Sequence, residues 1–77
     1  MRTSTVERVP LAVAVDFDAD AMVVALVDGR RLSVPLAWFP RLAKATPEQL
    51  RDFELLGDGE GIHWRGLDED ISVEGLL

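Results

Sequence analysis

The sequence predicts a small α+β domain: a three-stranded antiparallel meander covered by one or two short helices, with a short C-terminal strand and turn. Residues 11–17 and 30–36 each alternate between larger apolar and smaller or polar side chains, the period of a half-buried strand. Between them, residues 21–27 are apolar throughout. The stretch 36–53 then places apolar residues three and four positions apart, the spacing of one helix face.

The first two strands are expected to differ in how they are buried. In the strand at 11–17, one side carries the larger residues and should face the core: Leu11, Val13, Val15 and Phe17. The run at 21–27 is apolar on both sides and contains several β-branched residues. It is therefore predicted to be the central strand of the meander, covered on both faces.

The second and third strands are joined by Asp28-Gly29. This pair predicts a two-residue hairpin turn, because glycine tolerates the positive φ that such turns require. The inward residues of the third strand are Leu32, Val34 and Leu36. Pro35 cannot donate a hydrogen bond to a neighbouring strand, so one side of this strand's end should be unpaired.

Residues 36–53 are predicted to be two short helices that cover the meander. Trp38 and Leu42 are four apart and would share one helix face, so we expect Trp38 to fill the core. Thr46 and Gln49 can form a capping box, with Pro47 at the first helical position. This pattern predicts that the second helix begins after Thr46.

The last part of the chain is predicted from shorter signals. A glycine-rich turn at 57–61 precedes a short extended segment at 62–64 and an acidic turn at 68–70. Residues 72–77 should form either one helical turn or a docked tail. The whole chain, 1–77, is predicted to be one domain with residues 1–10 as a polar lead-in.

Composition excludes several classes of function. The 77 residues are 48% hydrophobic, which is ample for a folded domain of this size. The chain has no cysteine, so it has no disulfide, no thiolate zinc site and no thiol nucleophile. No apolar run approaches the ~20 residues that a membrane span needs, and the start does not resemble a signal peptide. We therefore expect a cytoplasmic protein with no membrane contact.

Charge is unevenly distributed along the chain. The formal net charge is −6, and residues 45–77 hold nine acids against Arg51 and Arg65. The only basic segment, residues 30–44, is short. A net acidic domain repels nucleic-acid phosphates, so direct nucleic-acid binding is not expected.

His63 and the acids around it are the first candidate for chemistry: Glu60, Asp68, Glu69 and Asp70. An imidazole with carboxylates can bind a divalent metal or relay protons. The chain has one histidine and no regular ligand spacing, and no nucleophile–base motif is present. The sequence therefore assigns no catalytic residue, no cofactor and no metal site.

Trp64 lies beside these acids and has two interpretations. It is either an exposed recognition anchor, since tryptophan is enriched at binding hot spots, or a residue that fills the end of a thin core. We favour the second. The candidate partner-binding residues of the sequence are Trp64, Asp68, Glu69, Asp70 and Ile71.

Several blocks of the sequence resemble the domain-of-unknown-function family 2442. The most specific blocks are Gly61-Ile62-His63-Trp64 and Leu67-Asp68-Glu69-Asp70-Ile71-Ser72-Val73, preceded by Asp28-Gly29-Arg30 and Trp38-Phe39-Pro40-Arg41-Leu42. The resemblance implies a small bacterial α+β domain without established enzyme activity. Many members are encoded beside a small toxin-like protein, which implies the antitoxin half of a toxin–antitoxin pair. Some members continue into a helix-turn-helix domain, which this sequence does not contain.

The sequence therefore predicts a non-enzymatic interaction domain, of the antitoxin type, whose partner is a small basic toxin-like protein or a second copy of the chain. An acidic surface from Asp58 to Glu74, anchored by Trp64 and Ile71, would cover a basic surface on that partner. One alternative is an orphan small enzyme or ligand-binding domain that uses His63 and Asp68–Asp70. Another is the dimerisation remnant of a DNA-binding regulator that lacks its helix-turn-helix.

Overall fold

The computed structural model describes residues 10–77, so nearly all of the predicted polar lead-in lies outside the described residues. The domain is α+β, as predicted. Its strands form two three-stranded antiparallel sheets. The first sheet consists of β1 (Ala12–Phe17), β2 (Ala21–Leu26) and β3 (Arg31–Pro35), and the second of β4 (Phe53–Leu56), β5 (Gly61–Trp64) and β6 (Glu69–Ser72). The helical segments are η2 (Leu36–Trp38), α1 (Pro40–Ala43), α2 (Pro47–Arg51) and η3 (Glu74–Leu76).

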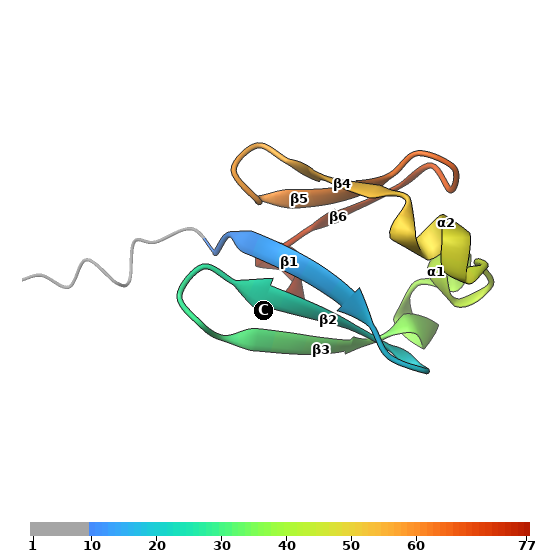
Figure 1. Cartoon of the computed structure of the whole chain (residues 1–77), viewed down its shortest axis with the longest axis horizontal. Helices are drawn as coiled ribbons and strands as arrows, with labels where there is room; N and C mark the ends of the chain where they lie inside the picture. Colours follow the sequence, from blue (N-terminus) through green and yellow to red (C-terminus); the bar gives the residue numbers. More distant parts are fainter. Residues whose placement is uncertain (1–9) are drawn as a thin grey trace, which may run out of the picture.

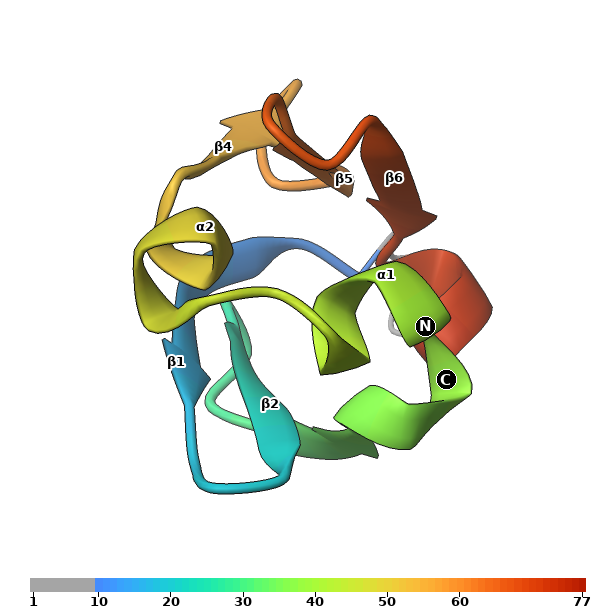
Figure 2. The same ribbon diagram turned by 90° about the vertical axis from the view of Figure 1, so that its right-hand side faces the viewer.

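The two sheets lie on opposite sides of the interior, and the short helices α1 and α2 lie at one end (Figure 1). Viewed from that end, α1 and α2 stand in front of the space between the sheets (Figure 2). Side chains from both sheets and both helices fill this space and form one apolar cluster. Within residues 10–77, no helix has the length and apolar character needed to cross a membrane.

The hairpin between β2 and β3 follows the Asp28-Gly29 signal with one difference. Leu26 N–H donates to the Arg30 carbonyl, so three residues rather than two form the loop, and Gly29 has a φ of 97°. Gly29 N–H donates to the Leu26 carbonyl, which closes a turn ahead of the glycine. A three-residue loop of this kind also places glycine at its positive-φ position, which is why the same dipeptide suits both loops.

The start of β1 departs from the predicted alternation. The register with β2 shifts between Ala12 and Ala14, which is a β-bulge. As a result Ala12 is buried, whereas Val13, predicted to face the core, is 57% exposed. The bulge inserts one extra residue, so the inward side changes parity there, and after it Val15 and Phe17 pack against the core as predicted.

The central strand β2 is covered on one side only within the described residues. Met22, Val24 and Leu26 are buried, and the outward residues Ala21, Val23 and Ala25 are half-buried. The prediction that both faces are covered was therefore wrong for this part of the chain. The outer side lacks a covering layer because the second sheet and the helices all pack against the inner side.

The two predicted helices are present, but they cover the meander only in part. The capping box of Thr46 and Gln49 is present, with Pro47 at the start of α2. Trp38, however, is 67% exposed. Phe39 has an extended conformation that separates η2 from α1, so Trp38 and Leu42 do not share one helix face. The prediction that Trp38 fills the core was wrong.

The second sheet covers the inner face of the first. Trp64 on β5 is completely buried, and its Nε1–H donates to the Leu50 carbonyl over 2.9 Å. The Phe53 ring lies 6.2 Å from Trp64 and 6.3 Å from Phe17, so aromatic contacts connect the sheets. Phe53 begins β4 and does not continue the predicted helix. The predicted acidic turn at 68–70 is in part strand, because β6 starts at Glu69.

The β4–β5 turn joins the two sheets at Gly59. Gly59 is buried with a φ of 107°, and its carbonyl accepts the Ala12 N–H over 2.8 Å. A Cβ atom at this position would lie 2.2 Å from the Ala12 carbonyl oxygen. Only glycine allows the turn and the start of β1 to approach so closely.

Candidate partner-binding surface

The outer face of the second sheet carries a row of three polar side chains. Glu54 on β4 lies opposite His63 on β5, and His63 lies opposite Asp70 on β6. Their strand neighbours point inward to the core, so alternation directs these three outward. Asp70 and His63 were candidates from the sequence, whereas Glu54 was not.

Asp70 is the most accessible member of this row, with 71% of its side chain exposed. One of its carboxylate oxygens pairs with His63 Nδ1. Among residues 10–77, Asp70 is the only side chain that hydrogen-bonds to His63. Glu54 instead lies 3.6 Å from Arg65. An ionised carboxylate can accept several hydrogen bonds, so Asp70 retains capacity for an external donor.

The β5–β6 turn is held by Arg41 of α1. Arg41 Nη1 donates to the Asp68 carbonyl over 2.6 Å and lies 3.8 Å from the Glu69 carboxylate. Asp68 has a φ of 53°, which is unusual for a residue other than glycine and which aspartate tolerates better than most. The predicted acids therefore differ in role: Glu69 and the Asp68 backbone stabilise the turn, whereas the Asp68 side chain is free to face solvent.

A shallow, open hollow lies beside β6, and we call it the β6 groove. It has a volume of about 210 Å³ and is lined by Phe39, Asp70, Ile71, Ser72, Gly75 and Leu76. Phe39 comes from the segment between η2 and α1, and Leu76 from η3. The groove therefore combines apolar walls with one exposed carboxylate. Sequence reasoning missed it, because its walls come from segments about thirty residues apart in the chain.

The two predicted apolar anchors expose little or no surface, although Ile71 lines the β6 groove. Trp64 is completely buried and Ile71 is 6% exposed, so both belong mainly to the core. Strand alternation explains this, since Ile62 and Trp64 on β5 and Ile71 on β6 point inward together. Two exposed large apolar residues are adjacent in the chain to groove residues: Trp38 precedes Phe39, and Leu77 follows Leu76.

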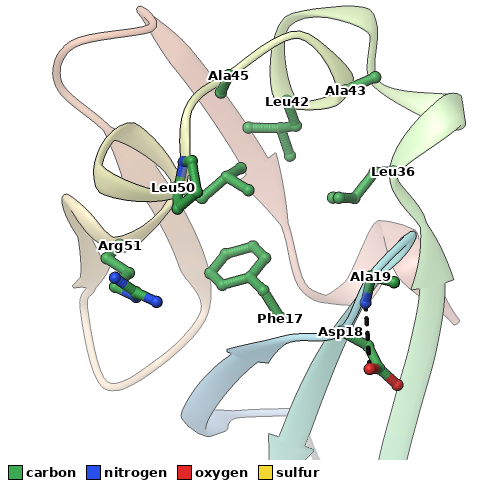
Figure 3. Close-up of a pocket in the computed structure, with 10 residues that line it drawn as sticks. Phe17, Asp18, Ala19, Leu36, Leu42, Ala43, Ala45, Leu50 and Arg51 are labelled. Atoms are coloured by element: carbon green, nitrogen blue, oxygen red, sulfur yellow. Dashed lines mark hydrogen bonds between the residues drawn. The ribbon is translucent and has the colours of Figure 1, made fainter.

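A larger cavity lies elsewhere, at the helical end of the domain. It has a volume of about 340 Å³, and Phe17, Leu42 and Leu50 point into it (Figure 3). Arg51 reaches its margin from α2 (Figure 3). None of the predicted site residues lines this cavity. It can take an apolar group, and its charged lining residues are Arg51 and Asp18, whose carboxylate accepts the Ala19 N–H.

The described residues also bear on metal binding. Within residues 10–77, no group of three or more histidine, aspartate or glutamate side chains is arranged to hold a metal ion. The Glu54–His63–Asp70 row is spread across three strands of a flat face. The chemistry that this face offers is ion pairing and hydrogen bonding.

Residues 12–77 match the family described as protein of unknown function (DUF2442). The chain belongs to this family. This confirms the resemblance carried by the Gly61–Trp64 and 67–73 blocks. No curated protein is significantly similar to this DUF2442 chain.

Two solved structures share the fold of this DUF2442 domain. A protein of unknown function from Rhodospirillum rubrum is 35% identical, with a TM-score of 0.75, over 87% of this chain and 83% of that one. An uncharacterised protein from Chromobacterium violaceum, solved by NMR, is 32% identical with a TM-score of 0.73. That match covers 87% of this chain and 63% of the other. These similarities give the family and the fold.

Proposed function

We propose that this DUF2442 domain is a non-enzymatic, cytoplasmic interaction module that binds a small basic protein along β6. The observation that carries the proposal is the position of Asp70, an exposed carboxylate at the rim of the apolar β6 groove. A lysine or arginine of a partner has an apolar stem and a charged head. The stem would lie along Phe39 and Leu76, and the head would reach Asp70.

The charge of the whole domain supports the same kind of partner. The net charge is −6, and most acids lie in the second half of the chain. Asp58, Asp68 and Glu74 are exposed and flank the second sheet. Such a field speeds encounter with a basic surface and disfavours acidic partners. In the antitoxin-type role that the family resemblance implies, this surface would cover the RNA-handling face of a toxin-like protein.

Co-purification from the native host, followed by mass spectrometry, tests this proposal. The tagged full chain is compared with an Asp68→Asn/Asp70→Asn variant and with Asp20→Asn/Glu48→Gln, which removes the same charge from exposed positions outside both the acidic surface and the groove. We expect a small basic protein with the parent and with the control. We expect its recovery to fall with the first variant and with added salt.

Two outcomes would contradict the proposal. One is equal recovery of the basic protein with both double variants, which would mean that total charge and not the groove matters. The other is the consistent recovery of no basic protein under native expression. Thermal unfolding of each variant by circular dichroism serves as the control, because exposed substitutions should leave stability within roughly 0.5 kcal/mol.

The His63–Asp70 pair favours one second candidate, an orphan enzyme or ligand-binding domain. A carboxylate that holds an imidazole is an arrangement used by general bases. Against it, the pair lies on an outer sheet face, whereas small-molecule sites are usually concave. A zinc titration followed by NMR distinguishes the two: saturable shifts of the His63 ring would favour the second candidate, and unchanged shifts the first.

A further inference from the structure

The outer side of β2 has a composition that is unusual for a solvent-facing strand. Its outward residues are Ala21, Val23 and Ala25, all apolar and half-buried. Antiparallel sheets with one open face commonly alternate between apolar residues inside and polar residues outside. The outer side of β2 therefore resembles a surface that another layer covers.

Small side chains form the middle of this face. A shallow depression of about 350 Å³ lies over it, with Ala14, Val23 and Ala25 among its lining residues. These side chains are small, so a second sheet could approach to the ~10 Å spacing of stacked sheets.

The charged residues that line this depression lie on opposite sides of β2, with Asp16 and Asp18 on the β1 side and Arg31 on the β3 side. Asp16 on β1 is opposite Val23, and Arg31 on β3 is opposite Ala25. Both line the depression, and neither forms an ion pair with any other residue of 10–77. One edge of the face is thus negative and the other positive. A surface of this kind is complementary to itself.

We propose that a second copy of this chain packs on this face, sheet against sheet, about a two-fold axis along β2. Such an axis places β1 of one copy over β3 of the other. Asp16 and Arg31 of one copy then face Arg31 and Asp16 of the second. The two charges are offset by two residues along the strands, about 7 Å, which the long arginine side chain spans.

The size of the face sets the strength of this dimer. Three strands of about six residues form a patch of roughly 14 Å by 20 Å. This is smaller than the ~800 Å² per partner of a standard interface, so the dimer is weak and forms at high protein concentration. The face is separate from the β6 groove. The dimer therefore does not depend on the basic partner proposed above.

Sedimentation equilibrium of the full chain at increasing concentration tests the dimer. We expect the average mass to rise toward that of two chains. Asp16→Arg or Arg31→Asp alone should raise the dissociation constant at least about tenfold, because like charges then face each other twice. The double variant Asp16→Arg/Arg31→Asp should recover the affinity of the parent. Glu48→Arg and Lys44→Asp, which make the same charge changes elsewhere, serve as matched controls.

The possible results decide the proposal in either direction. A mass that stays at that of one chain at every concentration would overturn it. A dimer that tolerates both single charge reversals would also overturn it, because its contact would lie elsewhere. Val23→Lys provides an independent variant at the centre of the face, and it should abolish the dimer while the thermal unfolding transition is retained.

Discussion

The two sheets present different outer faces to their surroundings. Along its central strand the first sheet presents the apolar residues Ala21, Val23 and Ala25. The second sheet presents Gly61 and His63, and His63 lies between the acids Glu54 and Asp70. Their inner faces, in contrast, both carry large apolar residues that meet in one core. Residues on the inner faces therefore decide whether the domain folds. Residues on the outer faces decide what each sheet can contact.

The two tryptophans should differ most in how much their replacement by alanine lowers the free energy of unfolding. Trp64→Ala removes a completely buried side chain that also donates to the Leu50 carbonyl, and should cost about 3–5 kcal/mol. Trp38→Ala removes an exposed side chain and should change stability by no more than about 0.5 kcal/mol. Urea unfolding measures both. Equal losses would mean that Trp38 is also part of the core.

Gly59 tests whether the two sheets depend on one close contact. In Gly59→Ala, the added Cβ would meet the Ala12 backbone, and the positive φ would be strained, so we expect a loss of about 1–3 kcal/mol. Gly66→Ala is the matched control, since nothing lies within 4 Å of its added Cβ. If the two variants unfold at the same urea concentration, the contact between Gly59 and Ala12 is not a constraint.

The hairpin of the first sheet should respond more weakly. Gly29 has a φ of 97° but open space around it, so Gly29→Val introduces backbone strain without a steric clash. We expect a cost of about 1–2 kcal/mol, the usual penalty for a side chain in a left-handed conformation. Thermal unfolding measures this cost. Unchanged stability would show that the loop adopts another conformation without loss.

Asp28 should give the smallest effect, and one that depends on pH. The Arg30 backbone N–H donates to its carboxylate and, with the Arg30 side chain, holds the pKa of Asp28 below its usual value. A lowered pKa in the folded state stabilises the protein above the usual aspartate pKa, and this contribution is lost as the pH falls through the lowered value. Asp28→Ala should therefore lower Tm slightly at neutral pH, and the difference should diminish in acid. A constant difference across this range would contradict the assignment.

The first sheet could be predicted from the sequence because its signals are local. Alternation in β1 and β3 and the glycine at position 29 all act within a few residues. The second sheet was only partly visible. Its strands have four residues each, and Glu69 and Asp70 are types depleted in strands, so their pairing with β5 depends on tertiary context.

The candidate site was predictable to a similar degree. The acids at 68–70 could be singled out from charge alone. The groove beside them could not, since Phe39 reaches it from a distant segment, and Arg41 of the same segment holds the neighbouring turn. Predicting which tryptophan is buried would have required the same tertiary information. Size and apolarity predict burial for both, and only the break at Phe39 and the register of β5 decide which one is buried.

The proposed dimer requires that the outer face of β1–β3, and not that of β4–β6, receives a second copy of the chain. Amide chemical shifts of the isotope-labelled full chain, followed as its concentration is raised, test this claim most directly. We expect progressive shifts for Asp16, Val23 and Arg31, while the shifts of His63 and Asp70 remain unchanged. Shifts confined to His63 and Asp70, or no concentration dependence at any residue, would contradict it.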